Sequence, residues 1–270
     1  MNVIVSAPVC PLRTAPDPAG SLADEALCGM VLEVLEQTSF TWWRVRTPYR
    51  YEGYAPVSCL LTDGGWEALP KKIVRWKTAA DVLAKPHIRA PVLRTLPLGA
   101  MVAAGEGEDW TAVALPGGTR GYIRSSLLGD PLTAPPNIPE DELRRRILEA
   151  ALLYQGTQYR WGGKTPLGID CSGLISMAYW LNGITVYRDA ELRPGFDLVE
   201  IQRDGMKPGD AIFFPGHVAL YLGHDRYLHA TGRAGSDGVV INSLDPNHPL
   251  YREDLAQSIL CVGSYKGFRG

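Results

Sequence analysis

Cys171 is the residue whose type and position best suit covalent chemistry. It follows Asp170 and opens a predicted helix over residues 171–182. The exposed N–H groups and the dipole of a helix N-terminus favour a thiolate over a thiol, and the thiolate is the nucleophilic form of cysteine. A buried structural role is the ordinary one for a free cysteine. We assign that role to the other four cysteines, because nothing around them in the sequence offers a base: Cys10, Cys28, Cys59 and Cys261.

His217 and His229 are the candidates for a base and for the group that orients it. Both fall in predicted strands of one hairpin. Side chains alternate between the faces of a sheet, so the length of the turn decides whether the two share a face. A three-residue loop at 223–225 sets Ala219 opposite His229 and makes the histidines diagonal neighbours, whereas a two-residue loop would separate them unless a bulge intervenes. On a shared face, His229 could hold the ring of His217 in one tautomer, as the third member of a catalytic triad does.

Hydrophobic spacing predicts the elements that must position these residues. A first helix is expected from Glu140 to Gly156, because acidic residues fill its first turn and apolar residues follow at helical spacing. The helix over 171–182 has one apolar face and ends at a Gly stop signal. Short apolar strands are predicted at 211–214, 217–222, 226–230 and 239–241. Helices followed by strands indicate an α+β domain.

Two stretches ahead of residue 131 repeat one another. Each contains a leading strand with Leu-Arg, then a Trp-led strand, then a Gly-Tyr segment that ends in Ser-x-Leu. Each copy consists of short apolar runs broken by Gly, Pro and Asp, which is typical of a small barrel of short strands. The shared segments lie at 11–14, 42–45 and 53–60 in the first copy, and at 92–95, 110–113 and 121–128 in the second.

A proline cluster separates the repeats from the helices. Segment 131–139 contains four prolines and reads as a linker. The predicted division is therefore a first barrel over 1–65, a second over 66–130, a linker over 131–139 and an α+β domain over 140–270.

The composition is that of an ordinary globular chain of 270 residues, with 46% apolar and 21% charged residues. The net charge of -2 gives no reason to expect nucleic acid as a partner, since nucleic acid favours a basic face. No stretch approaches the roughly 18–20 apolar residues that cross a bilayer, so no membrane is expected. The N-terminus lacks the basic start and apolar run of a signal peptide. We therefore expect a cytoplasmic protein, unless a leader has been removed.

The cysteines argue against a covalent or metal framework. Their number is odd, their spacing is wide and no CxxC pair occurs. Neither a set of disulfides nor a structural zinc site is expected, and a reducing compartment fits this pattern.

Five motifs in order resemble the NlpC family of papain-like cysteine peptidases. The resemblance covers roughly residues 140–265, and the two repeats ahead of it resemble bacterial SH3-like modules. The motifs are Tyr159-Arg160-Trp161-Gly162-Gly163, Asp170-Cys171-Ser172-Gly173-Leu174, the run from Lys207 to Phe214, the run from His217 to Gly223, and His229-Ala230.

This resemblance implies a multidomain fold, with two small all-β SH3-like barrels followed by an α+β papain-like catalytic domain. It implies that Cys171 is the nucleophile, that His217 is the general base and then acid, and that His229 orients it. No metal and no cofactor is needed. Tyr159, twelve residues before the nucleophile, would direct its hydroxyl to the oxyanion site beside the backbone N–H of Cys171.

The resemblance also implies substrate-binding residues. In relatives that act on small peptides, the residues flanking the nucleophile hold the free amine of an N-terminal L-Ala, which suggests this role for Asp170 and Ser172. Asp189, eighteen residues after the cysteine, matches the same group.

One departure concerns the first SH3-like module. Some relatives use an acidic residue of that module to help bind the amine, and this chain has Met30 where it would fall. Glu33 or Glu52 would have to substitute for it.

With two modules ahead of the peptidase motifs, the chain resembles the branch that cuts γ-D-glutamyl-L-diamino-acid bonds in peptidoglycan peptides. We expect it to hydrolyse that bond in small muropeptides with a free N-terminal L-Ala, during peptide recycling. An endopeptidase on intact wall, an inert wall-binding protein and an acyltransferase on the same core are the alternatives. The sequence leaves open whether the diamino acid is L-Lys or diaminopimelate, and it leaves the oligomeric state open.

Overall fold

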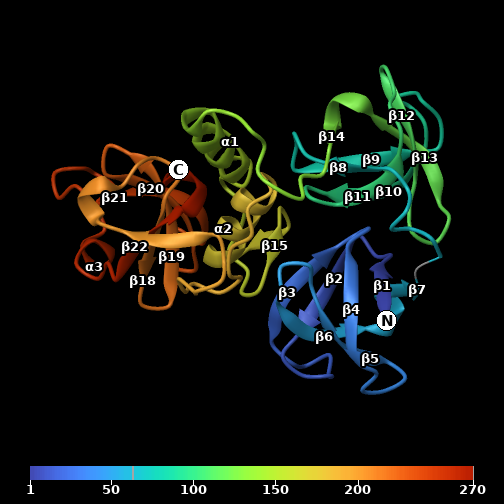
Figure 1. Cartoon of the computed structure of the whole chain (residues 1–270), viewed down its shortest axis with the longest axis horizontal. Coiled ribbons are helices and arrows are strands. Elements are labelled where there is room, and N and C mark those ends of the chain that lie inside the picture. Colours follow the sequence, from blue (N-terminus) through green and yellow to red (C-terminus); the bar gives the residue numbers. More distant parts are fainter. Residues whose placement is uncertain (63, 270) are drawn as a thin grey trace. The chain divides into compact units, whose positions relative to one another are not determined.

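The computed structural model of the chain describes residues 1–62 and 64–269 and is mostly β-structure (Figure 1). It divides into two compact units, Met1–Pro131 and Leu132–Gly270. We call them the N-terminal unit and the C-terminal unit. The boundary lies at the start of the proline-rich segment 131–139.

Two antiparallel sheets make up the N-terminal unit. Within the described residues each has seven strands, and each has a one-turn 3-10 helix before its last strand. The first sheet contains β1 (Asn2–Val5), β2 (Val9–Arg13), β3 (Leu22–Leu27), β4 (Val31–Glu36), β5 (Trp42–Arg46), β6 (Glu52–Pro56) and β7 (Leu60–Thr62). The second contains β8 (Lys71–Val74), β9 (Ala79–Leu83), β10 (Val92–Pro97), β11 (Met101–Ala104), β12 (Trp110–Ala114), β13 (Arg120–Arg124) and β14 (Leu128–Gly129).

The strand orders of the two sheets match, and the match corrects part of the predicted repeat. The order is β3-β2-β6-β5-β4-β1-β7 in the first sheet and β10-β9-β13-β12-β11-β8-β14 in the second. The Trp-led and Gly-Tyr segments occupy equivalent strands, β5 with β12 and β6 with β13. The Leu-Arg segments do not, because 11–13 lies in β2 whereas 92–95 lies in β10, the equivalent of β3. The match of three residues, Leu-Arg-Thr, is short enough to recur in non-equivalent strands.

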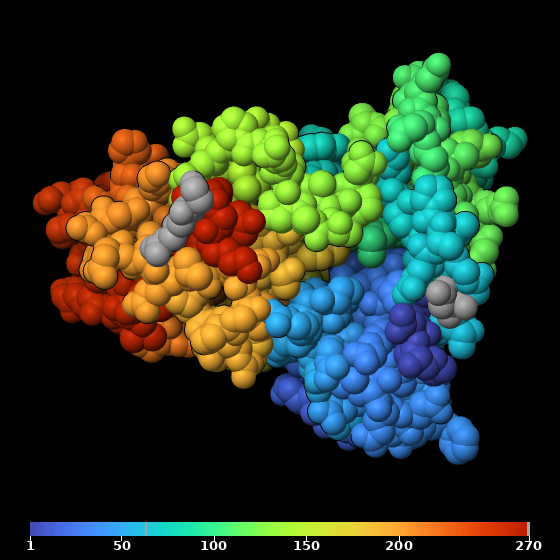
Figure 2. All heavy atoms as spheres, in the orientation of Figure 1, coloured from blue at the N-terminus to red at the C-terminus, as the bar shows by residue number. Residues whose placement is uncertain are grey.

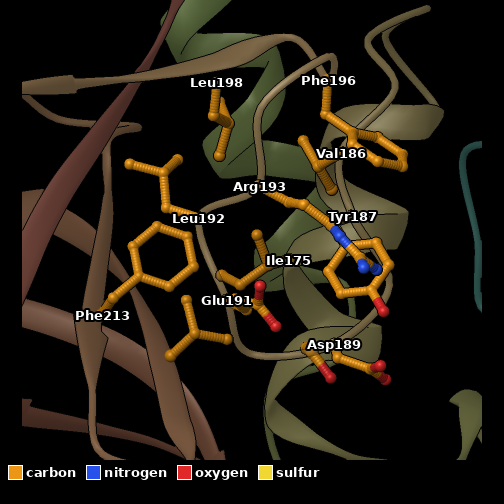
Figure 3. Close-up of a pocket in the computed structure, with 12 residues that line it drawn as sticks. Ile175, Val186, Tyr187, Asp189, Glu191, Leu192, Arg193, Phe196, Leu198 and Phe213 are labelled. Atoms are coloured by element: carbon orange, nitrogen blue, oxygen red, sulfur yellow. The ribbon is translucent and has the colours of Figure 1, made fainter.

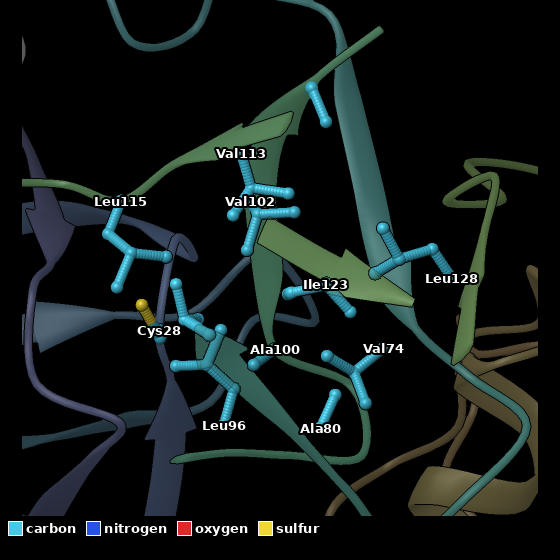
Figure 4. Close-up of a cluster of buried hydrophobic side chains, with 12 residues drawn as sticks. Cys28, Val74, Ala80, Leu96, Ala100, Val102, Val113, Leu115, Ile123 and Leu128 are labelled. Atoms are coloured by element: carbon cyan, nitrogen blue, oxygen red, sulfur yellow. The ribbon is translucent and has the colours of Figure 1, made fainter. Parts of the chain in front are cut away.

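The turn between β3 and β4 packs the first sheet against the second. Gly29 in this turn has a φ of 79°, and a Cβ there would meet the carbonyl oxygen of Met101. The N–H of Met101 donates to the carbonyl of Cys28 at 2.8 Å. The Cys28 side chain lies in the core of the second sheet with Leu96 and Val102 (Figure 4). A turn of the first sheet therefore completes the core of the second.

The C-terminal unit combines helices with a six-stranded antiparallel sheet of order β17-β22-β18-β19-β20-β21. Figure 2 shows that its visible face is formed jointly by the yellow-green of α1, the orange of the segment around residue 200 and the red of the C-terminal residues. The elements are α1 (Glu140–Leu152), β15 (Lys164–Thr165), β16 (Gly168–Ile169), α2 (Cys171–Trp180), β17 (Leu198–Ile201), β18 (Ala211–Phe214), β19 (His217–Gly223), β20 (Arg226–Thr231), β21 (Gly238–Ser243), α3 (Glu253–Ala256) and β22 (Cys261–Tyr265).

The predicted helices and strands of this unit are present, and others were missed. Strand β21 begins one residue early and ends two residues late relative to the prediction 239–241. Strands β17 and β22 were not predicted, although β22 pairs with both β17 and β18. In the described part of the chain, no helix is long and apolar enough to cross a membrane.

The turn between β19 and β20 is the shorter of the two alternatives that the sequence left open. It has two residues, His224 and Asp225, with φ values of 52° and 54°. Positive φ at both central residues identifies a type I′ hairpin turn. The two-residue alternative therefore holds and the three-residue one does not, because Gly223 pairs with Arg226 as the last residue of β19.

A β-bulge restores the register that a two-residue turn alone would shift. The register changes between Tyr221 and Gly223, which adds one residue to β19. Beyond the bulge the strands follow the predicted register, in which Ala219 faces His229. The shared face of His217 and His229 is confirmed, since their nearest ring nitrogens are 2.7 Å apart.

Candidate active site

Cys171 is the first residue of α2, and Asp170 is its N-cap. The backbone of Asp170 is extended, and its side chain accepts a hydrogen bond from the N–H of Gly173 at 2.6 Å. This cap satisfies one of the N–H groups that the first turn of a helix leaves unpaired. Gly173 must be small, because a Cβ there would meet the carbonyl oxygen of Gly163. The sequence Asp-Cys-Ser-Gly thus starts the helix with the thiol at its N-terminus.

Asp170 is held in a buried ion pair with Arg188. The guanidinium donates to the two carboxylate oxygens at 2.9 and 3.2 Å, and the Arg188 side chain is fully buried. Three further donors reach the same carboxylate, from Gly162, Ser172 and Gly173. Five donors therefore surround this carboxylate, which offers about four lone-pair sites. The geometry shows that Asp170 caps α2 and pairs with Arg188, and its expected amine-binding role stays a prediction.

The Cys171 side chain is buried, and burial raises the pKa of its thiol to about 11. The nearby carboxylate of Asp170 raises this pKa further, whereas the N–H groups of Val218 and Ser172 and the charge of Arg188 lower it. Cys171 is therefore a thiol at rest, because burial raises its pKa by more than the helix N-terminus lowers it. The thiolate expected from the sequence is not the resting form. Proton transfer to a base must accompany attack. Val218, whose N–H reaches the sulfur, directly follows His217.

The two histidines continue into a chain of hydrogen bonds. Nε2 of His217 lies 2.7 Å from Nδ1 of His229, and Nε2 of His229 lies 2.8 Å from Oδ1 of Asn242. The amide nitrogen of Asn242 donates to the carbonyl of Leu250 at 3.0 Å. Burial lowers the pKa of His217 to about 3 and the pKa of His229 to about 4. Both rings are therefore neutral at neutral pH, as a general base must be before it acts.

These lowered pKa values predict a loss of stability in mild acid. The pKa of His229 falls from 6.5 to about 4 on folding because the ring is buried. The unfolded chain therefore binds more protons than the folded chain between these values, and the free energy of unfolding falls as the pH drops through that window. For His229 the loss amounts to about 2 kcal/mol between about pH 7.5 and pH 5. Urea unfolding at the two pH values measures it.

The His229→Gln variant is the control for this prediction, because all other titrating groups remain. It is expected to lose about 2 kcal/mol less than the unmodified protein over the same interval. An equal pH dependence in both proteins would contradict the neutral, buried His229.

Tyr159 lies close to the nucleophile. Burial raises the pKa of its hydroxyl to about 12, and the neighbouring Cys171 and Asp170 contribute to this rise. A hydroxyl with such a pKa stays protonated at neutral pH and can donate a hydrogen bond to a developing oxyanion. The ring has little room to move, because a Cβ at Gly232 would lie 3.1 Å from its Cδ1 atom.

A small cavity of about 10 Å³, room for about one water molecule, is lined by two predicted substrate-binding residues, Ser172 and Asp189. It is also lined by Val218 and by apolar side chains of α2, β17 and β18 (Figure 3). Asp189 hydrogen-bonds the hydroxyl of Tyr187, whose pKa is raised by burial and then by this carboxylate. Ser172 and Asp189 thus share one cavity with the residue that contacts the thiol.

The acidic residues considered in the first sheet are already paired. Glu52 accepts hydrogen bonds from Arg44 and Arg46, and Glu33 accepts one from Arg46. Met30 is buried in the turn between β3 and β4.

Arg188 and Asn242 belong to this constellation and were not predicted. Each is a polar residue in a segment without a motif, and only the fold places one against Asp170 and the other against His229. The sole sequence signal for Arg188 is its position directly before Asp189.

Comparisons with known proteins agree with this arrangement. Residues 156–256 match the NlpC/P60 family, and residues 12–60 match the bacterial dipeptidyl-peptidase Sh3 domain. A crystal structure of an NlpC/P60 family protein from Bacillus cereus superposes with a TM-score of 0.81, covering 98% of this chain and 99% of that one, at 20% identity. At that identity the likeness speaks for the fold alone.

Two curated relatives bear on the family. Dipeptidyl-peptidase 6 of Lysinibacillus sphaericus is 44% identical over 273 residues, which cover 98% of this chain and 99% of that protein. The γ-D-glutamyl-L-lysine dipeptidyl-peptidase of Bacillus subtilis is 30% identical over 125 residues, which cover 43% of this chain and 40% of that protein. The likeness to the first relative extends over nearly the whole of both chains, and the chain therefore belongs to the NlpC/P60 family of cysteine peptidases.

Proposed function

We propose that this protein hydrolyses the γ-D-Glu–L-diamino-acid bond of small peptidoglycan peptides that carry a free N-terminal L-Ala. The observation that carries the proposal is the grouping of a buried thiol at a helix N-terminus with a neutral, hydrogen-bonded histidine pair. The name of the Bacillus subtilis relative supports the bond, and the names of both relatives support the release of a dipeptide.

In the first step the Cys171 proton passes to His217 as the sulfur attacks. The sulfur forms a bond to the γ-carbonyl carbon of D-Glu, and the hydroxyl of Tyr159 donates to the oxyanion. When the intermediate collapses, the C–N bond breaks and His217 returns the proton to the leaving amine. Water then attacks the thioester with His217 as base, which releases the L-Ala-γ-D-Glu dipeptide and the free thiol.

Recognition of the free amine falls to Asp189 and Ser172 in this proposal. Both residues line one small cavity; Asp189 supplies the negative charge, and the Ser172 hydroxyl, which donates to Asp170 and accepts from Arg188, keeps one lone pair for the amine. A peptide with a blocked N-terminus would bring no positive charge to Asp189 and is expected to bind weakly.

Mass spectrometry of two tripeptides tests the substrate. L-Ala-γ-D-Glu-L-Lys and its diaminopimelate analogue are incubated with the protein, alongside the same peptides with acetylated N-termini. Cleavage of the free-amine peptides alone supports the proposal. Equal cleavage of the acetylated peptides would favour an endopeptidase on intact wall, and no cleavage of any peptide would favour a wall-binding protein.

The oxyanion role of Tyr159 predicts a defect in catalysis. Tyr159→Phe keeps the ring against Gly232 and removes the donor. Loss of one oxyanion donor costs roughly 10²- to 10³-fold in kcat, and we expect a fall of this size with little change in KM. Steady-state kinetics on the tripeptide measures it. The control is Tyr187→Phe, which removes a hydroxyl bonded to Asp189 and should affect KM instead. An unchanged kcat in Tyr159→Phe would exclude Tyr159 from the mechanism.

We further propose that the protein works in the cytoplasm, where peptides from wall turnover can be recycled. The five cysteines are free thiols in the structure, which suits a reducing compartment. Immunoblotting of cytoplasmic and extracellular fractions distinguishes the two locations.

A further inference from the structure

The hydrogen bonds that link the histidine pair to Asn242 and Leu250 can have only one order of donors and acceptors. They end at the backbone carbonyl of Leu250, which can accept but cannot donate. The side-chain nitrogen of Asn242 must therefore face Leu250, at 3.0 Å. This fixes the amide, so that its oxygen Oδ1 faces Nε2 of His229 at 2.8 Å. The main chain thus decides which way the Asn242 amide points.

An amide oxygen only accepts hydrogen bonds, so Nε2 of His229 must carry the proton. In a neutral imidazole the other nitrogen is then an acceptor. Nδ1 of His229 accepts from Nε2 of His217, 2.7 Å away. His217 therefore carries its own proton on Nε2, which leaves Nδ1 with a lone pair. Nδ1 makes no hydrogen bond to the residues that the structure describes, and it is the nitrogen available to a thiol proton.

We propose that Asn242 is a positioning residue that sets the tautomers of both histidines and so directs the basic nitrogen of His217 to Cys171. The inference rests on the proposed function, since it assigns a direction to the proton transfer from Cys171. It adds a residue and a main-chain carbonyl to the catalytic apparatus, and neither lies in a motif of the sequence.

The opposite set of tautomers is disfavoured by the same geometry. A proton on Nδ1 of His229 would place two acceptors together at Asn242 and force the His217 proton to Nδ1. One buried hydrogen bond would be lost, which corresponds to a bias of roughly tenfold to a hundredfold between the tautomers. His229 is completely buried, so water cannot replace the lost bond.

The charged groups near His217 and His229 do not change this assignment of tautomers. The charged groups that act on both rings are Arg252 and Asp254, which pair with each other at 2.6 Å. Arg252 lowers the pKa of each histidine and Asp254 raises it, so the two effects oppose each other. No carboxylate among the described residues hydrogen-bonds either ring. The orienting group is an amide rather than an anion, so it selects a tautomer without favouring a charged imidazole.

Nitrogen-15 NMR of the imidazoles in the full chain tests the proposal without any substrate. The protonated and unprotonated nitrogens of a neutral ring have well-separated shifts. We expect Nε2 to be protonated in both His217 and His229 of the unmodified protein. Asn242→Leu has nearly the same volume and no acceptor, and it should shift a measurable share of both rings to the Nδ1 tautomer. Protonation of Nδ1 of His229 in the unmodified protein would overturn the proposal.

Kinetics on the tripeptide provides the second readout. In Asn242→Leu we expect kcat to fall by roughly 10²-fold, within the range that general acid–base catalysis contributes, and KM to stay nearly constant. Asn247→Leu is the matched control, because the Asn247 side chain is exposed and bonds only Asp245. A folded Asn242→Leu protein with unchanged tautomers and unchanged kcat would overturn the proposal.

Two further measurements keep the proposal testable if a variant fails to fold or no peptide is cleaved. Should Asn242→Leu fail to fold, Asn242→Asp retains an acceptor oxygen, and His229 must keep its proton on Nε2 in that variant. Should the unmodified protein cleave no peptide, the proposed function fails while the tautomers are still measured. In that event the rate at which iodoacetamide alkylates Cys171, in a Cys59→Ser background, reports the base directly, and it must fall in Asn242→Leu.

Discussion

Replacement of Cys171 by alanine is expected to abolish peptide hydrolysis while leaving the fold intact. Loss of the nucleophile in a comparable catalytic unit lowers kcat by about 10⁶-fold, and no other side chain of the site can form the thioester. The small side chain is tolerated because the residue lies at the first turn of α2, where the cap of Asp170 remains. Mass spectrometry of the tripeptide over long incubation measures the loss, and circular dichroism checks the fold.

Cys59 provides the matched control. It is the more acidic thiol, since a hydrogen bond from Cys10 lowers its pKa to about 7, whereas burial raises the pKa of Cys171 to about 11. If acidity alone selected the nucleophile, Cys59→Ser would be the inactive variant. We expect Cys59→Ser to retain full activity, because a base beside the thiol matters more than its resting pKa. Activity retained in Cys171→Ala would refute the mechanism.

Replacement of Arg188 by methionine is expected to be the most destabilising single change near the site. It leaves the carboxylate of Asp170 buried without its counter-charge, and breaking a buried ion pair in this way costs about 3–5 kcal/mol. The Arg188 side chain is completely buried, and Asp170 is nearly so, which prevents water from compensating. Urea denaturation measures the free energy of unfolding. Activity should fall as well, because Asp170 caps the helix that carries the thiol.

A double variant separates lost charge pairing from lost packing. Asp170→Asn removes the unpaired charge and keeps an oxygen for the N–H of Gly173, so combining it with Arg188→Met should recover most of the lost stability. Arg145→Met is the surface control, since its ion pair with Glu149 is exposed and should change stability by less than about 1 kcal/mol. A cost for Arg188→Met no larger than for Arg145→Met would show that the buried pair contributes little.

The hairpin shows what the sequence could and could not predict about the site. The alternation of strand residues predicted that His217 and His229 share a face, and the structure confirms it. The sequence left the loop length open, and positive φ at His224 and Asp225 selects the two-residue turn. A bulge between Tyr221 and Gly223 then keeps the two histidines on one face. Bulges depend on packing around the strand and leave no residue pattern that a single sequence displays.

Long-range partners were beyond prediction for a different reason. Arg188 reaches Asp170 across 18 residues, and Asn242 reaches His229 across 13. Both pairings depend on how segments without motifs fold back onto a helix or a neighbouring strand. A single buried charged or amide side chain leaves no periodic pattern in the sequence. Its role becomes visible only when the structure shows which residue it pairs with. The consequence was largest for Asp170, whose ion pair with the buried Arg188 the sequence did not indicate.

The turn that inserts Cys28 into the core of the second sheet affects how the N-terminal unit unfolds. Separate modules joined by a tether would melt in two independent steps. Here the core of the second sheet is weakened once the first sheet releases Cys28, because that side chain fills part of the interior with Leu96 and Val102. The two sheets should therefore behave as one cooperative folding unit, and a fragment containing only the second would expose a vacancy in its interior.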